Sequence, residues 1–128
     1  MKPWIGVDLD GTLAVYNGWN GPEHIGEPVP AMVERIKGWL GEGLEVRIFT
    51  ARVAGDRDGL HPRATIAIIQ NWLETEAGLP KLPVTNVKDF NMVELYDDRA
   101  VQVEFNTGRL MNDSMMQHRR ILQEDEEG

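Results

Sequence analysis

The sequence predicts an α/β fold, namely a three-layer, Rossmann-like, mostly parallel sheet with helices on both faces. Short apolar runs alternate with amphipathic segments, Gly and Pro separate them, and polar residues directly follow several of the apolar runs. The 128 residues, 41% of them hydrophobic, fit one domain with a single core. We place that domain at residues 1–123 and expect the acidic tail at 124–128 to be disordered.

The first half of the chain alternates strand, loop, helix and strand signals. Residues Trp4–Leu9 form an apolar run that predicts a buried strand. Residues 11–28 are rich in Gly, Asn and Pro, which predicts a loop. From Pro30 to Leu40 the apolar residues fall on one helical face, and a helix is expected to end at the glycines of 41–43. Leu44–Phe49 predicts the second strand.

The second half repeats the pattern with weaker signals. A polar loop at 51–62 precedes a predicted helix over Arg63–Ala77, which Gly78 ends. Three further short strands are expected at 83–87, 92–96 and 101–105, followed by a helix at 111–123.

Composition excludes several classes of protein. The chain has no cysteine, which removes disulfides, thiolate catalysis and cysteine-bound metals. The net charge of −8, half of it from Glu124–Glu127, disfavours a nonspecific nucleic-acid binder. No apolar stretch approaches the roughly 20 residues that cross a bilayer, and no signal peptide is evident, so we expect no membrane partner and a cytoplasmic location.

Carboxylates gather where the predicted strands end. Asp8 and Asp10 close the first strand, and Asp97 and Asp98 follow the fourth. Side chains alternate along a strand, so Asp8 and Asp10 are expected to face one pocket, on which Asp97 can close. Three carboxylates in one pocket repel unless a cation is present, and an all-oxygen set suits Mg²⁺.

A phosphate bound beside the metal would need positive charge and hydrogen-bond donors. Lys88 supplies the charge, and the Thr50 hydroxyl and the N–H groups of the turn at Gly11 supply donors. Lys81 is the alternative lysine, but it lies before the third strand.

Four segments in a fixed order resemble the motifs of the haloacid dehalogenase (HAD) superfamily of phosphohydrolases. These segments are DLDGT at 8–12, IFTAR at 48–52, the lysine of VTNVKDF at 88, and ELYDD at 94–98. The chain looks most like the small capless phosphatases of phages and bacteria. Residues 13–28 are too few for an inserted cap domain, so an open site is expected. Such a site suits bulky substrates or a covering subunit in a homo-oligomer.

The resemblance implies roles for the carboxylates. Asp8 would be the nucleophile that forms an aspartyl-phosphate, and Asp10 would protonate the leaving oxygen and then activate water. Mg²⁺ would be held by the Asp8 carboxylate, the Asp10 backbone carbonyl and Asp97. Asp98 would be a further ligand, which either contacts the direct ligands or reaches the metal through a water.

The resemblance also assigns the phosphate ligands. Thr50 and Lys88 would hold the phosphoryl oxygens, and Thr12 would orient Asp10. Arg52 follows Thr50 and is predicted to bind the substrate, either at a second phosphate or at its backbone. Tyr16 and the other aromatic residues of the first loop could stack on a base or sugar, or pack within the loop.

Competing interpretations fit less well. In a response-regulator receiver domain the phosphorylated aspartate ends a strand that here ends in Thr50, and Asp97 and Asp98 would have no role. A calcium loop would need its glycine at the sixth position. Turn chemistry alone would explain Asp8 and Asp10 but not the other three segments.

These observations predict a Mg²⁺-dependent phosphomonoesterase, with a nucleotide or a phosphorylated oligonucleotide end as its substrate. A small sugar or metabolite phosphatase working as an oligomer, and a non-catalytic phosphate- or metal-binding module, are the alternatives.

Overall fold

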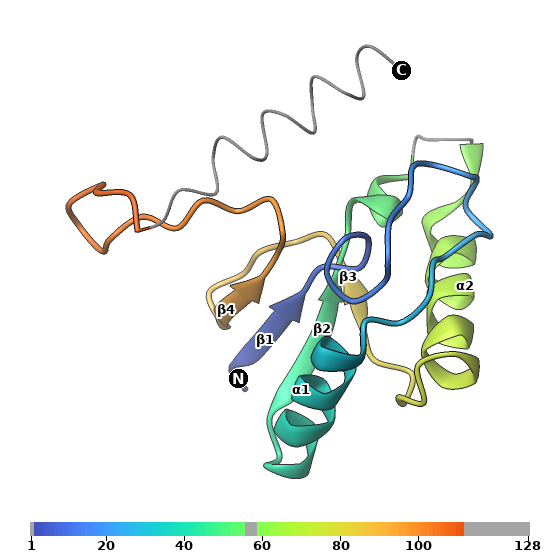
Figure 1. Ribbon diagram of the computed structural model, residues 1–128, viewed down its shortest axis with the longest axis horizontal. Coiled ribbons are helices and arrows are strands. Elements are labelled where there is room, and N and C mark those ends of the chain that lie inside the picture. Colours follow the sequence, from blue (N-terminus) through green and yellow to red (C-terminus); the bar gives the residue numbers. More distant parts are fainter. Residues whose placement is uncertain (1, 56–58, 112–128) are drawn as a thin grey trace. The chain divides into compact units, whose positions relative to one another are not determined.

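Figure 1 shows the computed structural model, which describes residues 2–55 and 59–111. The chain divides into two compact units, Met1–Asp97 and Asp98–Gly128. The first unit contains β1 (Trp4–Val7), α1 (Pro30–Gly41), β2 (Glu45–Phe49), the 3₁₀ helix η1 (Ala51–Ala54), α2 (Pro62–Thr75), β3 (Val84–Thr85) and β4 (Met92–Tyr96). The four strands form one sheet in the order β3-β2-β1-β4, and every neighbouring pair is parallel. The predicted α/β, Rossmann-like class is confirmed.

One face of the sheet carries the core of this unit. Ile5 and Val7 of β1 lie opposite Val46 and Ile48 of β2, and all four side chains are buried. The buried hydrophobic residues of α1 and of α2 join this same core cluster. The reason is topological, because successive right-handed crossovers from β1 to β2 to β3 place their helices on one face. The described helices therefore do not confirm the prediction of helices on both faces.

On the opposite face of the sheet, polar side chains contact the tryptophan of β1. Trp4 is fully buried yet lies outside the apolar core cluster. The Arg47 guanidinium stacks 4.5 Å from the centroid of the Trp4 ring, and the Trp4 indole N–H donates to Asp89 Oδ1 at 2.8 Å. Asp89 belongs to residues 86–91, the connection between β3 and β4. An irregular segment thus contacts this face through Asp89.

Element boundaries follow local chemistry. β1 ends two residues earlier than predicted because residues 8–14 close into a tight turn. α2 begins at Pro62, and the Nδ1 atom of His61 caps it by accepting the Arg63 N–H at 3.0 Å. The short helix η1 lies within the predicted polar loop of 51–62.

The second unit is described over residues 98–111. The predicted strand at 101–105 is wrong, since an isolated pairing of Val103 with Leu110 is the β-contact of this segment. A turn replaces the strand: Asn106 has φ +65°, and the Glu104 N–H donates to the Arg109 carbonyl at 2.7 Å. The predicted helix at 111–123 lies outside the described residues except for Met111, and the acidic tail lies outside them entirely. Among the described helices none has the length and apolarity to cross a bilayer.

Asp89 is expected to make stability depend on acid pH. The hydrogen bond from the Trp4 indole, the N–H of Asn91 and the charge of Arg47 lower the pKa of Asp89 below its ordinary value. A lowered folded-state pKa contributes stability that is present above the unfolded pKa and lost as pH falls through the folded one. Urea unfolding at about pH 7 and about pH 3 should therefore show a larger loss for wild type than for Asp89→Asn. Equal losses in both proteins would contradict this account.

Candidate functional site

Asp8 and Asp97 follow neighbouring parallel strands and so reach the same edge of the sheet. Asp8 comes directly after β1, and Asp97 directly after β4. The Asp8 backbone N–H donates to the carbonyl of Tyr96 at 2.9 Å, which continues the strand pairing to the point where both carboxylates emerge. The carboxyl ends of parallel strands are the usual place for a ligand site in this fold class.

The carboxylates at this edge form a cluster. One oxygen from each of Asp8, Asp97 and Asp98 lies within 4.8 Å of the other two. The Asp8 and Asp97 residues are half-buried, which raises the electrostatic cost of placing like charges together. An all-oxygen donor set of this kind matches Mg²⁺ better than softer metals. The Asp10 carboxylate is not one of the three, and its predicted contact with the metal runs through the backbone carbonyl.

The turn after Asp8 is held by its own backbone. Gly11 adopts φ +90°, a conformation that favours glycine, and its N–H donates to the Ala14 carbonyl at 2.8 Å. The Ala14 N–H in turn donates to the Leu9 carbonyl at 2.8 Å. A phosphate would therefore compete with Ala14 for the Gly11 N–H. Thr12 is half-buried in this turn, and its role in orienting Asp10 stays a prediction.

Asp10 is held by a bidentate ion pair with Arg52. The Arg52 Nε donates to Asp10 Oδ2 at 2.7 Å, and Nη2 donates to Oδ1 at 2.9 Å. The Arg52 side chain is 6% exposed and that of Asp10 is 22% exposed, so the pair is largely shielded from water. Two parallel charge-assisted bonds fix the plane of the carboxylate as well as its position.

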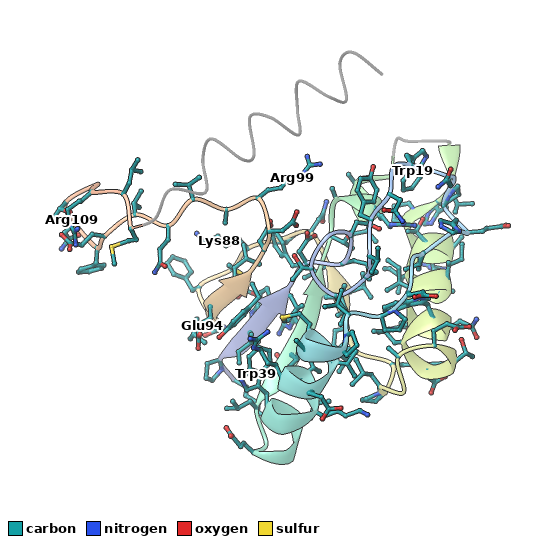
Figure 2. All side chains as sticks on the ribbon, viewed as in Figure 1. Trp19, Trp39, Lys88, Glu94, Arg99 and Arg109 are labelled. Atoms are coloured by element: carbon teal, nitrogen blue, oxygen red, sulfur yellow. The ribbon has the colours of Figure 1, made fainter. Side chains whose placement is uncertain are left out.

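The same guanidinium also holds the first loop. Nη1 donates to the Pro22 carbonyl at 3.1 Å, and Nη2 donates to the His24 carbonyl at 2.9 Å. The Trp19 ring, labelled in Figure 2, lies 4.7 Å from the guanidinium carbon. Four N–H donors of the Arg52 guanidinium are thus engaged within the protein, and the predicted contact of Arg52 with substrate stays a prediction. The sequence analysis did not predict the ion pair between Arg52 and Asp10. The one local signal for it is the presence of an arginine just beyond the second strand.

Thr50 and Lys88 occupy different environments. Thr50 is 3% exposed, and its Oγ1 accepts the Arg52 N–H at 3.2 Å as the cap of η1. Lys88 is exposed on the connection between β3 and β4, where Figure 2 labels it. Lys81, the alternative, lies before β3 and pairs with Glu74 at 3.8 Å. The predicted contacts of Thr50 and Lys88 with phosphoryl oxygens stay predictions.

A cavity of about 310 Å³ opens beside Asp10. Its walls include Asp10, Tyr16, His24, Ile25, Glu27 and Arg52. A backbone hydrogen bond holds the loop at 15–27, which forms most of this wall. The Val15 N–H donates to the Glu27 carbonyl at 2.8 Å. From α2, the Trp72 indole N–H donates to the Gly26 carbonyl at 3.1 Å.

Comparisons with known proteins support the fold alone. No family model matches the chain, and no curated protein matches it. The chain is similar to a solved structure of a conserved protein from Bacteroides thetaiotaomicron, with a TM-score of 0.54 and 20% sequence identity. That similarity covers 97% of this chain and 93% of the other.

The Arg52–Asp10 pair should show strong energetic coupling. Arg52→Ala, Asp10→Ala and the double variant form a cycle whose coupling free energy, measured by urea unfolding, should be about 1–3 kcal/mol. The exposed pair Lys37–Glu34, 3.9 Å apart on α1, serves as control and should couple by about 0.5 kcal/mol or less. Coupling no larger for Arg52–Asp10 than for the control would contradict the role assigned to the pair.

Proposed function

We propose that the chain is a Mg²⁺-dependent phosphomonoesterase of the HAD type that uses Asp8 as its nucleophile. The observation that carries the proposal is that Asp8 and Asp10, which are two residues apart, have different partners. Asp8 joins Asp97 in a half-buried acidic cluster, while Asp10 is held apart by Arg52. The two carboxylates thus have different partners, and the proposed reaction gives them different tasks, because Asp8 attacks phosphorus and Asp10 transfers a proton.

The cluster supports the choice of metal. Mg²⁺ at these oxygens would offset the repulsion among the carboxylates and lower the negative charge that an incoming phosphate meets. Asp8 and Asp97 would hold it from the ends of β1 and β4, with Asp98 next along the chain.

The chain's own residues account for the two chemical steps. A carboxylate oxygen of Asp8 attacks phosphorus, the bond from phosphorus to the leaving oxygen breaks, and Asp10 gives that oxygen a proton. Water then attacks the aspartyl-phosphate, Asp10 takes its proton, and phosphate leaves Asp8. A carboxylate has about four lone-pair positions, and the two bonds from Arg52 leave others on Asp10 for the proton.

Hydrolysis of an aryl phosphate tests the reaction. Wild type should hydrolyse p-nitrophenyl phosphate with Mg²⁺ and lose the activity with chelator. Asp8→Asn should lower kcat about a thousandfold or more, because the nucleophile is removed. Glu94→Gln, an exposed change on β4, is the control and should retain activity. Equal turnover by wild type and Asp8→Asn would refute the proposal.

Thermal unfolding tests the metal independently of turnover. Mg²⁺ at about 100 times its Kd should stabilise wild type by about 2.7 kcal/mol and raise Tm accordingly. Asp97→Asn should remove most of this shift, because one carboxylate of the cluster is lost. A Mg²⁺ shift in a protein that hydrolyses no phosphate ester would favour the non-catalytic binding module.

A further inference from the structure

We propose that the cavity beside Asp10 receives the leaving group of the substrate and takes an alcohol that bears no further phosphate. The inference rests on the proposed function and names the class of substrate. It departs from the sequence prediction that Arg52 binds a second phosphate and that an oligonucleotide end could be the substrate.

The position of the leaving group follows from the position of the proton donor, Asp10. A general acid must lie within hydrogen-bond reach of the oxygen that it protonates, so the leaving group lies against Asp10. Asp10 lines the cavity of about 310 Å³. This volume is near the lower end of small-molecule pockets, about 300–1,000 Å³, and suits a single nucleoside or sugar rather than a chain of nucleotides.

The charge of the walls disfavours a second phosphate. Among the described residues that line the cavity, Arg52 is the one with a full positive charge, and Asp10 and Glu27 are acidic. Its Nε, Nη1 and Nη2 atoms already make four hydrogen bonds, two to Asp10 and two to backbone carbonyls. A guanidinium has five N–H donors, so one is left for any ligand. An anionic leaving group would meet Glu27 without a matching cation.

The surface next to this cavity is also acidic. A second cavity of about 610 Å³ lies between residues 23–28 and α2. Its described lining includes Glu23, Glu27 and Glu76 and contains no lysine or arginine. A nucleic-acid strand leaving the site in this direction would find carboxylates where phosphate recognition requires cations.

The remaining walls suit an uncharged group. The lining also includes the aromatic residues Tyr16 and His24 and the apolar residues Val15 and Ile25. Such walls contact the faces of a base, a sugar or an aryl ring. Glycine is required at position 26 of this wall, because a Cβ there would collide with the Val15 carbonyl.

A matched pair of aryl esters tests the proposal. The enzyme with Mg²⁺ is given 4-hydroxyphenyl phosphate and 1,4-phenylene bisphosphate, which differ by one phosphate on the leaving group. We expect kcat/KM to favour the monophosphate about tenfold or more, after the factor of two for the second ester. Equal values, or a preference for the bisphosphate, would overturn the proposal. Failure to hydrolyse either ester, or p-nitrophenyl phosphate, would instead refute the phosphatase function itself.

A charge reversal in the wall identifies the cause of the preference. Glu27→Lys should narrow the ratio of the two kcat/KM values about threefold or more, because it replaces an acidic residue of the cavity lining with a cation. Glu42→Lys makes the same change in net charge at the C-terminal end of α1 and should leave the ratio as in wild type. A ratio that moves equally in both variants would assign the preference to overall charge and overturn the role of the cavity.

Discussion

The bidentate bond between Arg52 and Asp10 is the interaction on which the geometry of the site depends. It joins three segments, namely the turn after β1, the helix η1 and the loop at 19–24, none of which has regular pairing with the others. Removing two charges from water is costly, and the mutual attraction offsets that cost only when further hydrogen bonds satisfy the donors. The carbonyls of Pro22 and His24 supply those bonds, so the loop and the ion pair stabilise each other.

The pair also explains how two aspartates one residue apart coexist. Arg52 offsets the charge of Asp10 inside the protein, whereas Asp8 is directed to the cluster with Asp97. Asp8 and Asp10 therefore have different surroundings although only Leu9 separates them. Thr50 contributes indirectly, because capping η1 directs Arg52 back toward Asp10.

Much of the fold could be predicted because periodicity is local. The apolar runs at β1, β2 and β4 and the apolar stripe of α1 are read within a few residues, and polar residues at strand ends locate the site. The partner of Arg52 could not be predicted, since Asp10 is 42 residues away and the path of the loop decides the contact. The alternating residues of 101–105 resemble a strand, but a strand needs a neighbour and the turn at Asn106 gives an isolated pairing instead.

The connection at 86–91 is short for the distance that it spans between β3 and β4. From the end of β3 to the start of β4 the chain passes three strand spacings, about 14 Å, and descends four residues of strand, about 13 Å. The diagonal is about 19 Å, and seven Cα steps reach at most about 25 Å. Six residues in a helix, at about 1.5 Å per residue, could not span this distance, which accounts for the absence of a helix between β3 and β4. Lys88 lies on this connection, so its position depends on the separation between β3 and β4 and not on a helix packed against the sheet.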